Sequence, residues 1–264
     1  MQIRESFHCL KLQSSLMFRN IKPFKQRMSD NIASAHLPRH QQVMTSNQSW
    51  LTLLRQHRSI AVIRSSRQSV ARQMAQAVAT GGMRLIEITW NSDSLRDSSA
   101  SRACELISQL CRELPHCTIG TGTLLNLEQL QQAIDAGAQF LFTPHVDRAL
   151  IAAAVEAGVP IIPGALTPTE IVTAWDAGAS CVKVFPIEAV GGANYIKSLQ
   201  GPLGHIPLIP TGGVTLENAK EFITAGAIAV GLSGDLFPKP LIAAGDWDAI
   251  AQRAKTLNEQ LATQ

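Results

Sequence analysis

Three charged side chains in this sequence occupy positions from which they could do chemistry together. Lys183 lies within the otherwise apolar run CVKVF, Glu87 lies within LIEIT, and Arg64 ends IAVIR. Burial lowers the pKa of a lysine amine, and the neutral amine can attack a ketone to form an imine (Schiff base). A neighbouring carboxylate with a raised pKa can move protons for that reaction, and a guanidinium can hold a carboxylate or phosphate.

Each of these charges also has a purely structural interpretation. Lys183 could extend its amine outward between helices, Glu87 could form a buried salt bridge with Lys183 or Arg64, and Arg64 could be an exposed strand end. A central strand of a parallel sheet is covered on both faces, which favours the chemical interpretation of Lys183. For Glu87, pairing and catalysis are compatible.

The elements that must position these residues repeat in a regular order from residue 50 onward. Short β-rich runs alternate with longer amphipathic runs dense in Ala, Leu, Ile, Gln and Glu, which predicts strands and helices in turn. Glycine directly follows helices in ATGG, DAGA, EAGV, DAGA and TAGA, where it can end a helix in a tight loop. The predicted strands are 60–64, 85–89, 118–122, 140–144, 160–164, 181–185, 208–212 and 228–232. The predicted helices are 69–80, 95–113, 126–136, 147–157, 168–177, 191–200, 215–225 and 246–261.

Eight consecutive βα units predict an α/β fold of the (β/α)8 TIM-barrel type. A doubly wound open sheet is the alternative. Its first βα loop is expected to carry GxGxxG, whereas the corresponding loop here reads RSSRQS.

The alternation of side chains along each strand predicts which residues share the barrel interior, and catalytic groups belong at the C-terminal strand ends. The faces expected to point inward are Cys181, Lys183 and Phe185; Leu85, Glu87 and Thr89; Ile60, Val62 and Arg64; and Ile119, Thr121 and Thr123. The mouth of the barrel should therefore collect Lys183, Glu87, Arg64, Thr121 and Thr123.

Glycine-rich turns follow the last two predicted strands. PTGGVT contains Gly212 and Gly213, and GLSGDL contains Gly231, Ser233 and Gly234. Barrels often bind phosphate through backbone N–H groups in these two places. The alternative is that these glycines only allow the backbone turns of two ordinary loops and bind nothing.

The composition disfavours several classes of protein. Residues 1–47 hold seven Lys/Arg and two Asp/Glu, which leaves 16 Lys/Arg and 18 Asp/Glu in the nearly neutral remainder, so nucleic-acid binding has no electrostatic support there. No apolar run reaches the roughly 18 residues of a membrane span. The five cysteines form no CxxC pair, which indicates reduced thiols in the cytoplasm. No His/Asp/Glu cluster has metal spacing, so no metal and no other cofactor are expected.

The N-terminal part differs from the rest. Residues 1–47 are basic and rich in Gln, Ser and Asn, and we expect a disordered extension. A targeting peptide has a similar composition, and an upstream start codon chosen in error, with Met44 as the natural start of the first helix, is a further alternative. Residues 48–264 are expected to form the barrel domain.

From about residue 48 to 261 the chain resembles the class I aldolases for 2-keto-3-deoxy-6-phosphogluconate (KDPG) and 4-hydroxy-2-oxoglutarate (KHG). The matching stretches, in order, are LIEIT, IGTGTLLN, AGAQF, PIIPG, VKVFPIE, PTGG and GLSGDLF. The resemblance implies a carbon–carbon lyase that takes a 2-keto-3-deoxy sugar-acid phosphate. It also implies a homotrimer, and a place in the Entner–Doudoroff pathway.

The resemblance also implies roles for individual residues. Lys183 matches the Schiff-base lysine, and Glu87 matches the acid–base glutamate. Thr123 matches the threonine near the pyruvate carboxylate. Gly212 and Gly213 match the phosphate-binding glycines.

Two positions depart from the pattern of the family. Many members have an arginine where this chain has Asn91, whereas Arg64 ends the first predicted strand, as in the related 6-phosphogalactonate aldolases. We expect Arg64, with Thr123, to bind the substrate carboxylate instead. The second departure is Ser233-Gly234, which relatives usually carry in the reverse order, so that backbone donors rather than the Ser233 hydroxyl are expected to serve.

The expected reaction is cleavage of KDPG to pyruvate and glyceraldehyde 3-phosphate. Thr211 and Glu188 resemble the gluconate type, whereas Arg64 and Asn91 resemble the galactonate type. The alternatives are therefore the galactonate epimer, or 4-hydroxy-2-oxoglutarate cleaved to pyruvate and glyoxylate. A barrel that binds a sugar phosphate without turning it over is a further alternative from another class.

Overall fold

The computed structural model describes residues 39–90 and 98–262, without the side chains of 39–46 and 98–101. The predicted specificity residue Asn91 and most of the predicted N-terminal extension lie outside the described residues. Helix α2 begins at Arg39 and runs through the domain boundary predicted at residue 48.

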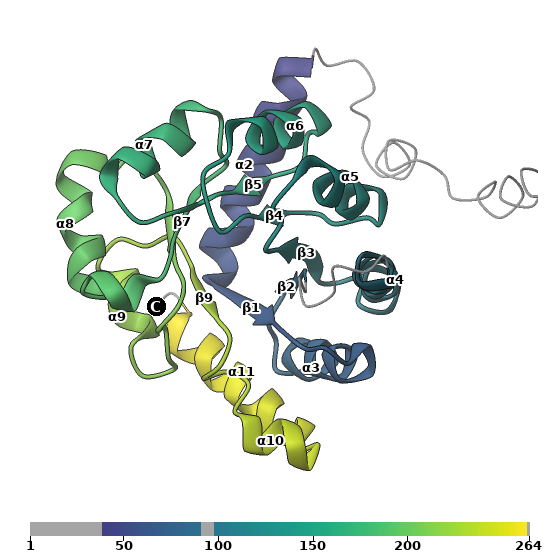
Figure 1. Cartoon of the computed structure of the whole chain (residues 1–264). Helices are drawn as coiled ribbons and strands as arrows, with labels where there is room; N and C mark the ends of the chain where they lie inside the picture. Colours follow the sequence, from purple (N-terminus) through teal and green to yellow (C-terminus); the bar gives the residue numbers. More distant parts are fainter. Residues whose placement is uncertain (1–38, 91–97, 263–264) are drawn as a thin grey trace, which may run out of the picture. The chain divides into compact units, whose positions relative to one another are not determined.

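Strands and helices alternate along the described chain in the predicted order (Figure 1). The strands are β1 (Ser59–Ile63), β2 (Leu85–Thr89), β3 (Thr118–Gly122), β4 (Leu141–Phe142), β5 (Ile161–Ile162), β6 (Gly164–Ala165), β7 (Val182–Val184), β8 (Leu208–Pro210) and β9 (Val230–Leu232). The helices are α2 (Arg39–His57), α3 (Gln68–Thr80), α4 (Ser98–Glu113), α5 (Leu127–Asp135), α6 (Arg148–Ala157), α7 (Pro168–Asp176), α8 (Ala193–Leu203), α9 (Ala219–Thr224), α10 (Lys239–Ala244) and α11 (Trp247–Leu261), with a 3₁₀ turn η1 (Ile187–Val190). The sequence did not predict α10.

All the paired strands run parallel, in two sheets. The larger sheet has the order β5-β4-β3-β2-β1-β9, and the smaller has the order β6-β7-β8. The first strand pairs with β2 on one side and with the last strand on the other. This confirms a parallel α/β architecture, and it is not the order of a doubly wound sheet, in which the strand order reverses at a switch point.

The predicted fifth strand is divided in two, which corrects the sequence prediction. Pro163 lies between β5 and β6, and proline has no backbone N–H to donate to a sheet. β5 pairs with β4, whereas β6 pairs with β7. The Pro163 carbonyl accepts a hydrogen bond of 2.9 Å from the backbone of Lys183, so the chain passes here directly from one sheet to the other.

A second connection joins the two sheets on their other side. The backbone N–H of Ile228 donates to the carbonyl of Leu208 at 3.0 Å, and Thr211 forms an isolated parallel bridge with Gly231. The strands that carry the predicted phosphate loops therefore lie beside each other.

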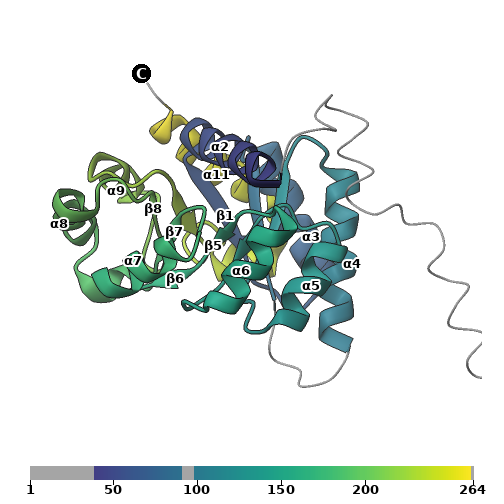
Figure 2. The ribbon, with the colours of Figure 1, turned by 90° about the horizontal axis from the view of Figure 1, so that it is seen from above.

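The helices surround the strands, and the larger core cluster fills the space between them (Figures 1 and 2). A second cluster lies on the other face of the strands, where α2 buries Trp50 and Leu54 against strand residues. The Trp50 indole stacks on Phe140 with ring centroids 4.9 Å apart and donates to the Cys181 thiol at 3.4 Å. The helix α2 thus covers the N-terminal ends of the strands and leaves the C-terminal ends for a site.

Candidate functional site

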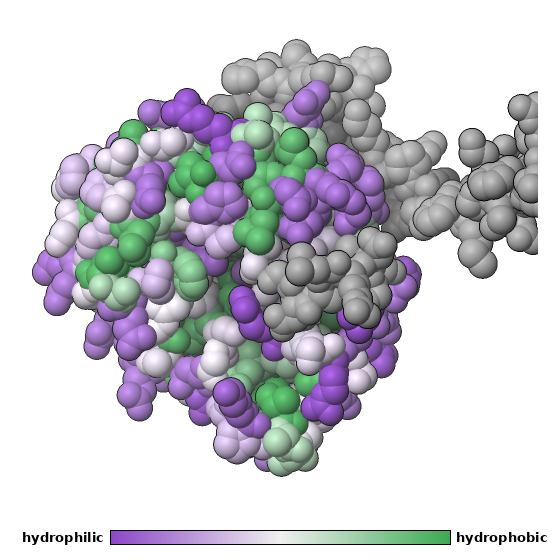
Figure 3. Space-filling model, in the orientation of Figure 1, coloured by the Kyte–Doolittle hydropathy of each residue, from purple (hydrophilic) through white to green (hydrophobic). Residues whose placement is uncertain are grey.

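One cavity collects the predicted site residues that the structure describes, apart from Thr121. It has a volume of about 350 Å³, within the range of small-molecule sites, and lies at the C-terminal strand ends. Figure 3 shows the face onto which these strand ends open, where hydrophobic and hydrophilic residues are mixed. The lining residues are Val62, Arg64, Glu87, Thr89, Thr123, Pro144, Lys183, Phe185, Thr211, Gly212, Gly213, Val214, Thr215, Gly231, Ser233, Gly234 and Asp235.

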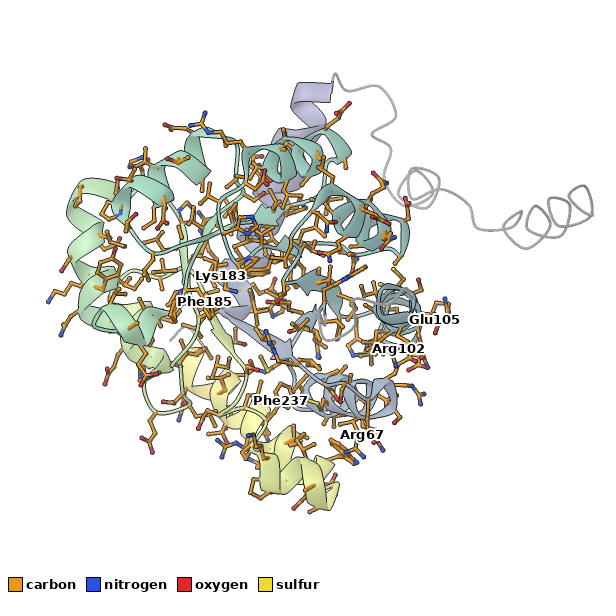
Figure 4. The ribbon with its side chains drawn as sticks, in the orientation of Figure 1. Arg67, Arg102, Glu105, Lys183, Phe185 and Phe237 are labelled. Carbon is orange, nitrogen blue, oxygen red and sulfur yellow. The ribbon has the colours of Figure 1, made fainter. Side chains whose placement is uncertain are left out.

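Lys183 is the central residue of β7, and its backbone is paired on both sides. The flanking Val182 and Val184 are fully buried in the helix-facing core, so alternation along the strand turns Lys183 to the cavity. Its ammonium nitrogen lies 4.4 Å from the ring centroid of Phe185 and 5.7 Å from that of Phe142. Figure 4 labels Lys183 beside Phe185 near the centre of the strands. Aromatic rings therefore remove water from much of the amine.

The charge state of Lys183 follows from these surroundings. Burial lowers the pKa of its amine, the Glu87 carboxylate opposes this change, and the Arg64 guanidinium adds to it. Arg64 directly follows β1, lines the same cavity and is exposed. The lowered pKa increases the fraction of free amine at a given pH, which is the form that attacks a carbonyl group.

Glu87 is 2 % exposed on the interior face of β2. Its Oε2 atom has no hydrogen-bond partner, and the described residues offer it no ion pair within 4.0 Å, so the salt bridge to Lys183 or Arg64, the structural alternative for Glu87, does not form. Burial raises the pKa of this carboxyl group, and the positive charges of Lys183 and Arg64 oppose that increase without cancelling it. A buried carboxyl group with one oxygen lacking a partner, facing a cavity, is poised to exchange a proton with a ligand.

The structure corrects the predicted interior face of β3. Ile119 packs in the helix-facing core, and the Thr121 hydroxyl donates to the Ile88 carbonyl at 2.6 Å, so neither faces the cavity. The interior positions are Gly120 and Gly122, because a side chain there would collide with the Phe140 ring and with Glu87 Oε1 respectively. The glycines are required since a large ring and a carboxyl group already occupy the space.

Thr123 lines the cavity although the alternation that predicted it is reversed. It lies directly after β3 with a φ of +66°, a left-handed conformation that is rare for threonine. This turn of the backbone brings the side chain to the cavity at the strand end. The predicted location of Thr123 in the cavity is therefore correct, although the strand face from which it was predicted is wrong.

The two glycine-rich loops form one end of the cavity. Gly212 and Gly213 have φ values of +79° and +98°, and a side chain at 213 would collide with Glu188. Asp235, which sequence reasoning missed, connects the loops, because its Oδ2 accepts from the Leu216 backbone at 2.9 Å and from Arg253 at 3.2 Å. No signal in the sequence pointed to this connection.

Two threonine hydroxyls in this cavity are also orphaned, which here means that the oxygen is buried and has no hydrogen-bond partner. Thr89 is 4 % exposed and Thr211 is 6 % exposed, and neither Oγ1 atom has a hydrogen-bond partner. Together with Glu87 Oε2, they are the three orphaned buried side-chain atoms of the described chain, and all three line one cavity. The alternation had placed Thr89 on the Glu87 face, but no role was assigned to it. Buried polar atoms without partners indicate a site that a polar ligand completes.

Two features are absent from the described residues. Nowhere in residues 39–90 and 98–262 do three or more His, Cys, Asp or Glu side chains form a group suited to a metal ion. Over the same ranges, no helix is both long and apolar enough to cross a membrane.

A family model, individual relatives and a solved structure all relate this chain to the same family. Residues 51–253 match the aldolase family described as KDPG and KHG aldolase. The 2-dehydro-3-deoxy-phosphogluconate aldolase of Dickeya dadantii is 36 % identical over 182 residues, which are 69 % of this chain and 82 % of the relative. The KHG/KDPG aldolase of Escherichia coli is 32 % identical over the same shares. The KDPG aldolase of Legionella pneumophila, solved with pyruvate captured as a covalent carbinolamine, superposes with a TM-score of 0.70 at 25 % identity, over 78 % of this chain and 97 % of that one.

Proposed function

Because this chain belongs to the KDPG and KHG aldolase family, a family of lyases, we propose that it cleaves KDPG to pyruvate and glyceraldehyde 3-phosphate through an imine on Lys183. The observation that carries the proposal is the shared cavity of Lys183 and Glu87. A desolvated amine and a buried carboxyl group are the pair that an imine-forming aldolase needs. The carbinolamine in the Legionella pneumophila aldolase supports the same chemistry here.

The first half of the reaction forms the imine. The free amine of Lys183 attacks the C2 ketone of the substrate and gives a carbinolamine. Protonated Glu87 donates its proton to the carbinolamine hydroxyl, which leaves as water while the nitrogen lone pair forms the iminium. The raised pKa of Glu87 supplies the neutral acid for this step.

The second half breaks the carbon–carbon bond. The Glu87 carboxylate takes the proton of the C4 hydroxyl, directly or through a water. The C4–O bond becomes the aldehyde of glyceraldehyde 3-phosphate, and the C3–C4 electron pair moves into the iminium to give an enamine. Protonation at C3 and hydrolysis of the iminium then release pyruvate and restore the amine.

The remaining lining residues would hold the two ends of the substrate. We assign the carboxylate to Arg64 and Thr123, and the far phosphate to the loops that carry Gly212 and Gly213, and Gly231, Ser233 and Gly234. Binding the remote phosphate would position the bond that breaks. The orphaned hydroxyl of Thr211 supports its assignment as a specificity residue, which would distinguish the stereoisomers of the substrate.

The substrate is tested by coupling pyruvate release to a dehydrogenase. We expect the catalytic efficiency (kcat/KM) for KDPG to exceed that for the C4 epimer and for 4-hydroxy-2-oxoglutarate, since the glycine loops offer a place for the phosphate. Higher efficiency with 4-hydroxy-2-oxoglutarate would contradict the phosphate assignment, and higher efficiency with the epimer would contradict the gluconate assignment. Ligand-induced stabilisation without any pyruvate release would instead support a non-catalytic sugar-phosphate-binding barrel.

The pH dependence of imine formation tests the electrostatic coupling of Arg64 to Lys183. The Arg64 charge helps to lower the Lys183 pKa, so Arg64→Gln should raise it. The free amine then appears at higher pH, and the acid limb of pyruvate trapping by borohydride should move to higher pH when trapping is measured at saturating pyruvate. Arg64→Lys keeps the charge and serves as the control. An Arg64→Gln limb that stays in place or moves to lower pH would contradict the coupling.

We also propose that the two sheets form a single closed (β/α)8 barrel. The hydrogen bond from Lys183 to Pro163 and the bridge between Thr211 and Gly231 support closure at the two places where the sheets meet. We propose a homotrimer and a role in the Entner–Doudoroff pathway, because the resemblance to the family implies both. The exposed side chains of Leu125 and Leu127, at 45 % and 51 %, support an apolar contact between copies. The thiols of Cys104, Cys117 and Cys181 are not in disulfides, which supports our proposal of a cytoplasmic location.

A further inference from the structure

We propose that the Thr89 hydroxyl donates a hydrogen bond to the substrate carboxylate, as a binding residue between Arg64 and Thr123. The inference rests on the proposed function and adds a residue to its carboxylate site. Three observations carry it: the orphaned state of the hydroxyl, its position in the strand register, and the donors that a carboxylate needs.

The orphaned state of the hydroxyl indicates a missing ligand. Thr89 is 4 % exposed, its Oγ1 has no partner, and the residue lines the cavity. Leaving a buried hydroxyl unpaired destabilises a protein. Such a group is therefore expected where a bound ligand supplies the missing hydrogen-bond partner. Thr121 on the neighbouring strand is the contrast, since its hydroxyl is bonded to the Ile88 carbonyl and points away from the cavity.

The strand register places Thr89 between the two residues already assigned to the carboxylate. β1 pairs with β2 up to Ile63 and Ile88, so Arg64 follows beside Thr89. On the other side Thr89 pairs with Gly122, and Thr123 comes next. These three residues therefore form a row across adjacent strand ends, with Glu87 two residues deeper on the Thr89 face.

The chemistry of the row matches a carboxylate. A carboxylate has two oxygens with about four acceptor positions, which a guanidinium fork and two hydroxyl donors can share. Arg64 and Lys183 are the cations among the described lining residues, and Lys183 is committed to the imine. A neutral donor beside Arg64 thus adds binding without adding a charge that would further lower the Lys183 pKa.

The test measures the pyruvate concentration for half-maximal borohydride trapping on Lys183 in the full-length protein. Thr89→Val keeps the shape and removes the hydroxyl, and should raise this concentration about tenfold to a hundredfold, as expected for a lost bond to a charged group. Thr89→Ser should restore binding to within about threefold. Acetone, a ketone without a carboxylate, should be trapped equally by the wild type and by Thr89→Val.

Thermal unfolding gives a second readout that distinguishes binding from structure. Without ligand, Thr89→Val should raise Tm by a few degrees, because an unpaired buried hydroxyl is removed, whereas Thr121→Val should lower Tm and leave pyruvate trapping unchanged. Wild-type trapping of pyruvate by Thr89→Val, or an equal loss with acetone, would overturn the proposal; the latter outcome would assign the hydroxyl to proton transfer. Absence of any adduct in the wild type would instead refute the proposed function itself.

Discussion

Replacing Lys183 with Met is expected to abolish the borohydride-trapped pyruvate adduct and to lower kcat/KM for KDPG by a factor on the order of 10⁵ or more, as for loss of a catalytic nucleophile. The methionine side chain keeps a similar length and lies easily beside the rings of Phe142 and Phe185. The loss is therefore chemical, and Tm should not fall. Mass spectrometry of the intact protein and of its peptides measures the adduct and its position.

The matched control is an exposed lysine outside the cavity. Lys220 lies on α9, and Lys220→Met should trap pyruvate as the wild type does. An adduct on any lysine other than Lys183, or undiminished turnover by Lys183→Met, would refute the imine mechanism.

Glu87→Gln is expected to lower kcat by about 10²–10⁴, the usual contribution of a general acid–base group. The amide cannot give up or accept the proton, although it fills nearly the same volume beside Gly122. Imine formation and bond cleavage should both slow, so rapid-quench measurements should find slow accumulation of the adduct and slower pyruvate release. Wild-type rates for both steps would remove Glu87 from the mechanism.

Glu87→Gln is expected to stabilise the protein although it lowers activity, and the stabilisation should depend on pH. Burial raises the folded-state pKa of Glu87, so the ionised form is disfavoured in the folded protein. Stability therefore falls as pH rises from the unfolded pKa through the folded pKa, and Glu87→Gln removes that loss. Glu87→Gln should unfold at a higher temperature than the wild type at neutral pH, and the difference should diminish as the pH falls below 4.5, the ordinary pKa of a glutamate. Equal melting curves across this range would contradict a raised folded-state pKa of the buried Glu87 carboxyl group.

Much of the site was predictable because alternation within one strand is a local property. In β2, Leu85, Glu87 and Thr89 share the interior face as predicted, and in β7 the valines on either side of Lys183 face the helices. The five αβ-loop motifs were also correct, since Gly82, Gly137, Gly158, Gly178 and Gly226 all have positive φ values. Each of these inferences needed only neighbouring residues.

The sequence by itself determined the order of the elements, the alternation along each strand and the residue types at the strand ends, which were enough to bring Lys183, Glu87 and Arg64 to one cavity. Only the tertiary structure decided which face of β3 points inward, because both faces of a parallel strand are covered and a period of two fits either choice. Gly120 and Gly122 face inward since the Phe140 ring and the Glu87 carboxyl group fill that space. The orphaned hydroxyl of Thr89 is likewise a property of its neighbours in space, which no spacing along the chain records.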